Sequence, residues 1–221
     1  MMMNAIIQLY KELLAKHGPQ GWWPLLELHT KKGNARGVNP TKTGSIQGYH
    51  PNDYSYPKTR KQQFEICVGA ILTQNTNWPN VEKALINLQK KKLLNAKRIL
   101  NADENLLKLC IRPAGYYNQK AKKLKIFSQF FIMQKNKIPP RNQLLALWGV
   151  GPETADSILL CVYKQPEFVV DMYTKRILLK RKIIDETATY DDIKQLIEKN
   201  LPKKFALYQE FHALLVEEGK H

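Results

Sequence analysis

The sequence predicts an all-α fold. Apolar residues recur every three or four positions through most of the chain, which is the spacing of one buried helix face. No alternating apolar and polar run is long enough to indicate a β-strand, and no internal repeat is present. With 221 residues, 43% of them hydrophobic, the chain can bury a real core in one large domain or two small ones.

The helical segments follow one another with few interruptions. The first is expected to be capped by Asn4 and to end at Gly18. Residues 29–63 contain Gly, Pro, Asn and Lys and almost no aliphatic side chains, which predicts a long, irregular, partly ordered loop. The other helices are expected at residues 64–73, 79–90, 103–110, 118–133, 141–147, 152–163, 172–182, 190–200 and 203–218.

The charge balance is strongly basic. The chain has 35 Lys and Arg residues against 19 Asp and Glu residues, a formal net charge of +16. Such an excess predicts attraction to a polyanion, with an affinity that falls as salt rises. A lysine-rich solvated surface is the alternative, so charge by itself does not decide for nucleic acid.

Composition also indicates the compartment. Cys67, Cys110 and Cys161 are widely spaced inside apolar helical patterns, which predicts buried free thiols in an intracellular protein. No apolar run reaches the length of a membrane span, and no signal peptide is visible. We therefore expect no membrane association.

The most informative stretch is LALWGVGPETADS, residues 145–157. It predicts a short helix, a tight turn and a second helix, because Gly149 and Gly151 on either side of Val150 allow a sharp turn and a close approach to another molecule. Pro152 suits the first position of the second helix. The free N–H groups at that helix start would point toward the turn and could hold a phosphate.

This hairpin, with Asp171 following 18 residues after Glu153, resembles the signature of the base-excision DNA glycosylases of the endonuclease III superfamily. Residues 64–78 and 112–124 resemble the two family loops that probe DNA. Two other segments, GPQGWWP (18–24) and EFHALLVEEGKH (210–221), are similar to the subgroup that includes the 3-methyladenine DNA glycosylase III type.

The resemblance implies two helical lobes with a cleft between them. A six-helix barrel lobe would cover residues 57–165 and include the helix-hairpin-helix, and residues 1–56 with 166–221 would form the second lobe. The implied partner is double-stranded DNA with a damaged base, which flips into the cleft because chemistry on a stacked base is geometrically blocked. We expect a monomer in the cytoplasm, associated with the nucleoid.

Asp171 matches the catalytic aspartate of the family. At the start of the expected helix 172–182, the helix dipole favours its carboxylate form. A fixed carboxylate there would stabilise the positive charge that develops on the sugar and orient the attacking water. The simpler alternative is an ordinary helix-capping aspartate.

Glu153 departs from the pattern of the bifunctional members, which carry a lysine at this position. That lysine attacks the sugar and cleaves the strand through a Schiff base. Glutamate has no amine, so we expect a monofunctional glycosylase without efficient AP-lyase activity. Lys120 and Lys175 are nearby lysines that would allow weak lyase side activity.

The resemblance also implies a set of DNA contacts. The hairpin backbone would meet a phosphate, Asn75, with Gln74 beside it, would enter the gap left by the flipped base, and Tyr116 would act as a wedge on the opposite strand. Trp148 replaces the usual proline of the turn. The implied hairpin contacts with DNA are Gly149, Val150, Gly151, Glu153 and Thr154. The implied contacts with other phosphates are Asn118, Lys120, Lys175 and Arg176. A Na⁺ or K⁺ ion would lie on the carbonyls of Leu145, Leu147 and Val150.

Trp22, Trp23 and Trp78 bear on the choice of base. Together with Lys220 they occupy positions that resemble the base pocket of the 3-methyladenine type. Indole faces attract cations, which suits a positively charged alkylated base. The alternative for the tryptophans is packing between the lobes.

No cofactor is expected to be required. Many endonuclease III relatives end with four cysteines that hold an iron–sulfur cluster, and the chain as given ends at His221 without them, so a cluster segment would have to follow in a longer form.

The leading function is a monofunctional glycosylase for alkylated purines such as 3-methyladenine. Glycosylases for uracil, mismatched thymine or oxidised bases, and a non-catalytic DNA-binding module, remain open, as does the role of the loop 29–63.

Overall fold

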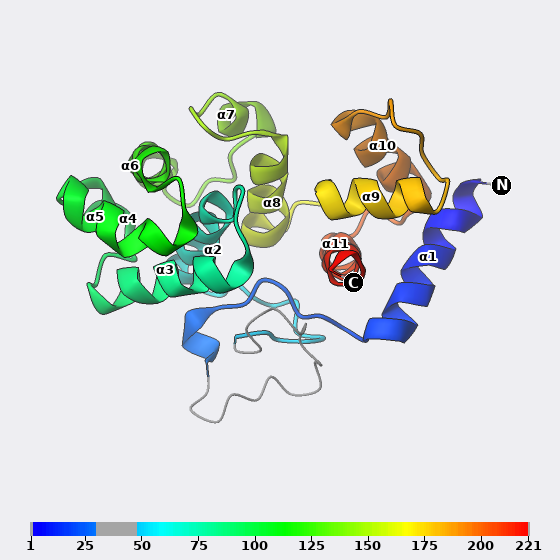
Figure 1. The fold of residues 1–221 in the computed structure, drawn as a ribbon, viewed down its shortest axis with the longest axis horizontal. Helices are drawn as coiled ribbons and strands as arrows, with labels where there is room; N and C mark the ends of the chain where they lie inside the picture. The colour runs from blue at the N-terminus through cyan, green and yellow to red at the C-terminus, as the bar shows by residue number, and fades with distance from the viewer. Residues whose placement is uncertain (1, 30–47, 221) are drawn as a thin grey trace.

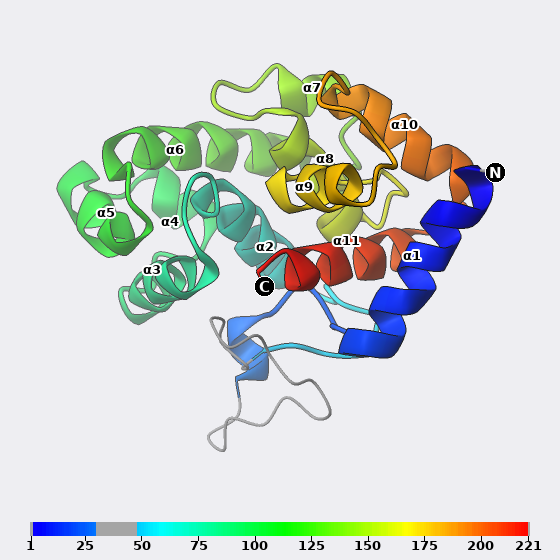
Figure 2. The same ribbon diagram turned by 45° about the vertical axis from the view of Figure 1, so that its right-hand side comes forward.

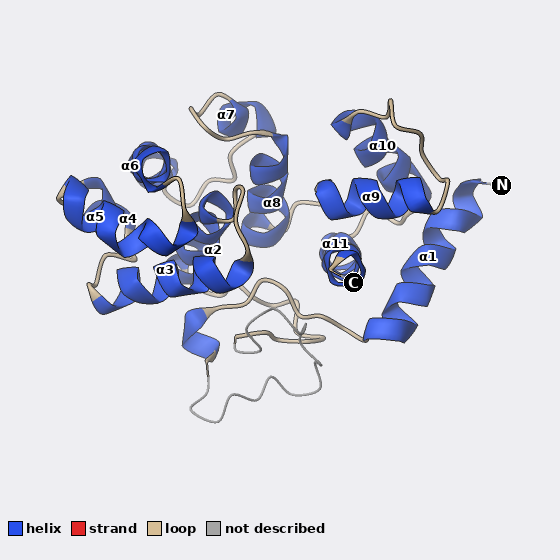
Figure 3. Ribbon diagram, viewed as in Figure 1, coloured by secondary structure: helices blue, strands red, loops and turns tan. Residues whose placement is uncertain are grey.

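The computed structural model describes residues 2–29 and 48–220, with side chains described from residue 5 onward. The predicted all-α class is confirmed, because the described residues form helices and contain no strand (Figure 3). The part of the expected loop at 30–47 lies outside the described residues.

The described part of the chain contains eleven α-helices and two short 3₁₀ helices, η1 and η2. In chain order they are α1 (Met2–His17), η1 (Leu26–Leu28), α2 (Arg60–Leu72), α3 (Trp78–Lys90), α4 (Ala96–Leu100), α5 (Glu104–Ile111), η2 (Arg112–Ala114), α6 (Tyr117–Gln134), α7 (Arg141–Leu145), α8 (Pro152–Tyr163), α9 (Met172–Lys180), α10 (Tyr190–Asn200) and α11 (Phe205–Gly219).

Some boundaries differ from the sequence prediction. Helix α1 begins before Asn4, and the short helix α4 was not expected. Helix α2 begins at Arg60 rather than at residue 64, because Thr59 and Gln62 form a capping box that starts the helix inside the expected loop. Polar residues at a helix start resemble loop residues in sequence, and only the reciprocal cap hydrogen bonds distinguish the two.

The helices pack in two groups. Helices α2 to α8 pack mainly against one another, with α4 beside α6, α2 beside α8 and α3 beside α5 (Figure 1). Helix α11 packs against α1 and α9, and α1 also packs against α10, although these elements come from opposite ends of the chain (Figure 2). Helix α11 also contacts α8, which joins the groups. The lobe boundaries 57–165 and 1–56 with 166–221 stay a prediction.

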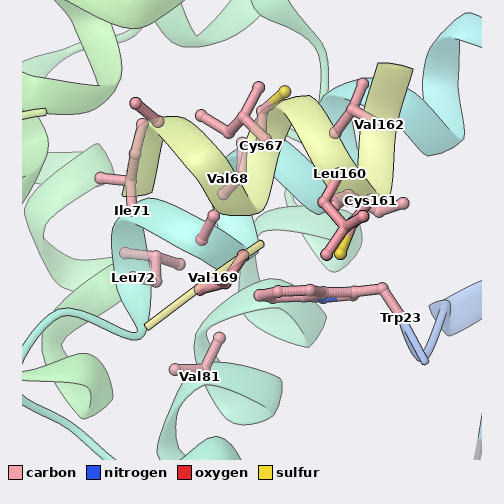
Figure 4. Close-up of a cluster of buried hydrophobic side chains, with 14 of the residues drawn as sticks. Trp23, Cys67, Val68, Ile71, Leu72, Val81, Leu160, Cys161, Val162 and Val169 are labelled. Atoms are coloured by element: carbon pink, nitrogen blue, oxygen red, sulfur yellow. The ribbon is translucent and has the colours of Figure 1, made fainter. Parts of the chain in front are cut away.

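The N-terminal segment contributes to the core of the larger group. Trp23 is buried and lies near Leu160 and Cys161 of α8 (Figure 4). A Cβ atom at Gly69 of α2 would lie 3.1 Å from the indole Nε1 of Trp23, tighter than an ordinary contact. The missing side chain at Gly69 therefore makes room for this ring, and the ring fixes the segment after α1 against α2.

A buried charge cluster joins the hairpin helices to α10. Asp156 of α8 is fully buried, and Arg141 of α7 donates to both its carboxylate oxygens, at 2.7 and 3.0 Å. From α10, the Tyr190 hydroxyl donates to Oδ2 at 2.8 Å, and the Lys194 ammonium lies 3.2 Å from Oδ1. Lys194 also pairs with Glu167. Every oxygen of the buried carboxylate thus has a charged or hydroxyl partner, which such burial requires.

Replacing Asp156 with alanine should lower the free energy of unfolding by about 3–5 kcal/mol, because it leaves Arg141 and Lys194 without their buried partner. Urea unfolding followed by circular dichroism measures this. Arg181→Gln is the matched control: it removes the solvent-exposed pair between Arg181 and Glu12, and a loss below about 1 kcal/mol is expected. Equal losses in the two variants would contradict the assigned role of Asp156.

Candidate functional site

The turn between α7 and α8 has the predicted tight geometry. Gly149 adopts φ +83°, a conformation that residues with a side chain rarely adopt. The Val150 N–H donates to the Leu147 carbonyl at 3.0 Å, and Gly151 is the N-cap residue of α8. The first-turn amides of α8 have no partner within the helix. This end of α8 can therefore receive an anion; the phosphate contact itself stays a prediction.

A glutamine and a lysine lock the α2–α3 loop onto this turn. The Gln74 amide donates to the Gly149 carbonyl at 3.0 Å and to the Thr154 hydroxyl at 2.9 Å. Lys123 donates to the Gln74 side-chain oxygen at 2.5 Å. The Gln74 amide is thus bonded within the protein, and a contact of Gln74 with DNA stays a prediction. Asn75 beside it is exposed, with φ +52°.

The aliphatic part of Lys123 also covers Gly149. A Cβ atom at Gly149 would lie 2.5 Å from the Lys123 Cε. Sequence reasoning missed Lys123 because it is one of several similar lysines in α6, and no local pattern distinguishes it. The hydrogen bonds that hold this loop join residues 49 to 80 positions apart in the chain.

The loop before α6 also presents exposed polar and aromatic groups. Gly115 has φ +68°, and Tyr116 lies in the left-handed region with φ +45° while 65% of its surface is exposed. Asn118 is exposed in the first turn of α6. An exposed ring on a tight loop suits the wedge predicted for Tyr116, which stays a prediction.

Lys120 lies inside the protein, and its predicted contact with a phosphate stays a prediction. Its side chain is buried, and its ammonium group donates to the carbonyls of Leu72 at 2.9 Å and Ala114 at 2.8 Å. Burial lowers the pKa of this ammonium to about 8. Lys120 therefore ties the α5–α6 loop to the end of α2, and its amine is held inside the protein by two carbonyls.

Asp171 caps α9 as the sequence predicted. Its Oδ1 accepts the Thr174 N–H at 2.7 Å, which fixes the carboxylate at the helix start. Glu153 of α8 is close enough to interact with it. Glu153 is exposed at the start of α8, and partial loss of solvent, followed by repulsion from Asp171, raises the pKa of its carboxyl to about 7. Asp171 and Glu153 therefore bring two carboxyl groups close together.

The three predicted pocket tryptophans are neighbours in space. The Trp22 and Trp23 ring centroids are 5.9 Å apart, and those of Trp23 and Trp78 are 5.6 Å apart, both in edge-to-face geometry. Trp22 and Trp78 are partly exposed, whereas Trp23 is buried. The packing alternative therefore describes Trp23, and the two outer rings form a wall that a ligand can reach.

Helix α11 links this wall to Asp171. The His212 ring lies edge-on to Trp22, with centroids 5.6 Å apart, and hydrogen-bonds to the backbone of Val169, two residues before Asp171. Gln209 donates to the Trp22 carbonyl. Burial lowers the pKa of His212, although the Asp171 carboxylate opposes this. His212 therefore interacts with both parts of the site.

The remaining predicted residues lie around α9. Lys220 follows α11, and its ammonium is 3.4 Å from Glu217 Oε2. Lys175 donates to the carbonyls of Glu186 at 3.1 Å and Ala188 at 2.9 Å, which holds the loop after α9.

Two further cations lie near the site, Arg176 on α9 and Lys122 beside the hairpin. Arg176 of α9 donates to the Gly219 carbonyl at the end of α11. At the hairpin, Trp148 is 48% exposed, with the Lys122 ammonium 4.5 Å from its ring centroid. A basic and aromatic surface therefore borders the turn, and the roles of Lys175, Arg176 and Lys220 toward DNA stay predictions.

The described residues form neither a metal-binding cluster nor a membrane-spanning helix. Within residues 2–29 and 48–220, no three His, Cys, Asp or Glu side chains come close enough to hold a metal ion. The three cysteines are free, buried and apart from one another. No helix in the described ranges has the length and apolar character that a membrane crossing needs.

The raised pKa of Glu153 predicts a pH-dependent stability. A carboxyl group with an ordinary pKa of 4.5 is ionised in the unfolded chain above that pH, while Glu153 keeps its proton in the folded chain until about pH 7. Its contribution to stability therefore falls as the pH rises from about 4.5 to about 7. The melting temperature of Glu153→Gln relative to the parent should increase between about pH 5 and pH 7.5, and a constant difference would contradict this.

Comparison with known proteins gives consistent matches. A family model described as HhH-GPD superfamily base excision DNA repair protein matches residues 68–203. A Methanocaldococcus jannaschii protein provisionally named a DNA repair glycosylase is 41% identical, covering 97% of this chain and 87% of its own length. Endonuclease III of Thermotoga maritima is 28% identical over 75% of this chain and 78% of its own.

Solved structures agree on the fold. The crystal structure of the H. pylori 3-methyladenine DNA glycosylase bound to 1,N6-ethenoadenine has a TM-score of 0.70 and 27% identity, and the match covers 99% of this chain and 97% of that one. A non-covalent endonuclease III–DNA complex has a TM-score of 0.68 at 17% identity, covering 97% of this chain and 84% of that one.

Proposed function

The chain belongs to the HhH-GPD superfamily of base excision DNA repair proteins, and we propose that it is a monofunctional DNA glycosylase that removes alkylated purines such as 3-methyladenine. The comparisons by themselves support a DNA repair glycosylase of this family, and the substrate is our proposal. The observation that carries the finer proposal is the arrangement of Asp171, fixed at the start of α9, beside a wall of partly exposed indole rings.

The proposed reaction is hydrolysis of the N-glycosidic bond of a flipped base. As the bond breaks, its electron pair leaves with the base and positive charge develops on the sugar. The Asp171 carboxylate stabilises this charge and orients a water molecule. The water oxygen bonds to the sugar carbon, and its proton passes to the carboxylate and then to solvent, leaving an abasic site.

The indole wall supports the choice of an alkylated base. Methylation of adenine at N3 gives the base a positive charge, and the faces of Trp22 and Trp78 attract such a cation. A cationic base leaves as a neutral molecule, so it needs little acid catalysis. The similarity to the H. pylori enzyme, whose ligand is a modified adenine, supports the same class of substrate.

DNA is proposed to lie across the loops that surround this wall. The amides at the start of α8 would hold a phosphate, with a Na⁺ or K⁺ ion on the hairpin carbonyls, and Asn75 and Tyr116 would enter the base stack. No other cofactor is part of the proposal. The partner is double-stranded DNA with a damaged base, bound by a monomer.

The raised pKa of Glu153 favours a second candidate function. A carboxyl group that is partly protonated at neutral pH can donate a proton to a departing neutral base. Neutral lesions such as uracil or an oxidised base need this assistance, whereas 3-methyladenine does not. A glycosylase for neutral bases is therefore the alternative.

A panel of defined lesions tests the substrate. Release of 3-methyladenine from alkylated DNA should exceed release of uracil, mismatched thymine and 8-oxoguanine. Asp171→Asn should lower the rate by about a hundredfold or more, because the carboxylate charge is lost. Asparagine can still cap α9, so the melting temperature and DNA affinity should change little. Faster release of uracil or an oxidised base would favour the alternative, and full activity of Asp171→Asn would overturn the mechanism.

Borohydride trapping tests the monofunctional proposal. The parent protein should give no efficient covalent complex with damaged or abasic DNA, because position 153 has no amine and the Lys120 amine is held by two carbonyls. Glu153→Lys places an amine beside Asp171 and should increase the trapped fraction. Glu153→Gln is the control with no amine. Efficient trapping of both the parent and Glu153→Gln would contradict the proposal.

A further inference from the structure

A groove remains that the proposed reaction does not use. It lies where the start of α2, the start of α4 and the end of α6 meet, and its volume is about 450 Å³. Its lining is mostly apolar: Ile132 is partly exposed there, and small parts of the Phe64, Leu94 and Phe131 side chains reach the surface. This size and this lining are typical of a binding site.

The rim of this groove, hereafter the basic groove, carries only positive charge. Arg60, Lys61, Lys97 and Lys135 line it, and none of the described lining residues is acidic. Lys61 lies 3.9 Å from Glu27, a half-exposed pair that compensates part of one charge. Like charges gathered around a concave apolar surface attract an anionic ligand.

One cation of the rim is held rigidly. The Arg60 guanidinium donates to the Phe131 carbonyl at 2.5 Å and lies 4.0 Å from the centroid of the Phe131 ring. An arginine that is already fixed loses little side-chain entropy when it binds a carboxylate. The rim is therefore partly preorganised for an anion.

The basic groove continues into a second cavity. This neighbour has a volume of about 400 Å³, shares Lys61, Leu94 and Asn95 with the first, and adds Lys92 and Arg98. None of its described lining residues is acidic either. Two adjoining cavities, both lined by cations, suit an extended ligand better than a compact one.

The basic groove lies at the opposite end of the helices from the proposed DNA-probing loops. Helix α2 runs 13 residues from Arg60 to the loop that carries Asn75, and α6 runs 18 residues from the Tyr116 loop to Lys135. At about 1.5 Å per residue, these helices separate the groove from those loops by roughly 18 and 26 Å. A ligand in the groove therefore leaves the base-binding wall free.

We propose that the basic groove docks an acidic peptide segment of a partner protein, with large apolar side chains of that segment seated on the inner surface. Carboxylates of the segment would pair with Arg60, Lys97 and Lys135. Two exposed apolar side chains, Met133 and Ile138, flank Lys135 in the chain and extend the surface that such a segment can cover. Acidic carboxylates with apolar anchors complement both properties of the groove.

A second nucleic-acid segment fits the same surface less well. Phosphates need cations and hydrogen-bond donors, and they gain nothing from an apolar floor. Single-stranded bases need an open aromatic face for stacking, but the Phe64 and Phe131 rings are each only 3% exposed. The apolar floor under a basic rim therefore favours a peptide.

The test uses the full chain and three fluorescein-labelled peptides of about ten residues. The first alternates Glu with Leu and Phe, the second replaces Leu and Phe with Ser, and the third replaces Glu with Gln. Fluorescence anisotropy should show binding of the first peptide that weakens with salt and is at least about fivefold tighter than binding of the other two. Equal binding of the first two peptides, or no binding of the first, would overturn the proposal.

Variants locate the site. Lys97→Glu with Lys135→Glu should weaken binding of the first peptide at least about fivefold, whereas Lys203→Glu with Lys204→Glu, which changes the charge equally on exposed residues before α11, should weaken it less than twofold. Lys97→Gln with Lys135→Gln should give an intermediate loss and serves if the Glu variant fails to fold. Base release should be unchanged in all of them. Loss of affinity for undamaged duplex DNA without peptide binding would instead assign the groove to nucleic acid and overturn the proposal.

Discussion

The burial of the Asp156 carboxylate constrains much of the structure. A buried charge persists only when partners surround it, and here those partners come from α7 and α10. Lys194 extends the cluster to Glu167, and Glu198 of α10 accepts the Phe168 N–H at 2.7 Å. The hairpin helices and the segment that leads to Asp171 are therefore held by one network, so the α7–α8 turn and the Asp171 carboxylate keep a fixed relation.

A second set of contacts holds the loops around the cleft. Gln74 and Lys123 fix the α2–α3 loop to the turn at Gly149, and Lys120 fixes the α5–α6 loop to the end of α2. These side chains use their polar groups inside the protein, so their neighbours Asn75 and Tyr116 remain exposed. Rigid loops with exposed tips suit insertion into a base stack, because less ordering is required when DNA binds.

The site combines groups with different tasks. Asp171 is fixed by the cap of α9, while the neighbouring Glu153, which is exposed, has a raised pKa. The indole wall is connected to Asp171 through His212 and α11.

The sequence by itself determined the all-α class, the glycine turn, the capping role of Asp171 and the family, because these depend on helical periodicity and short motifs. Only the tertiary structure decided which polar side chains are free. Lys120 and Lys123 look alike in sequence, yet one is buried on two carbonyls and the other covers Gly149. Burial and partners depend on contacts between distant segments, and the early start of α2, the roles of Gln74 and His212, and the basic groove all arise from such contacts.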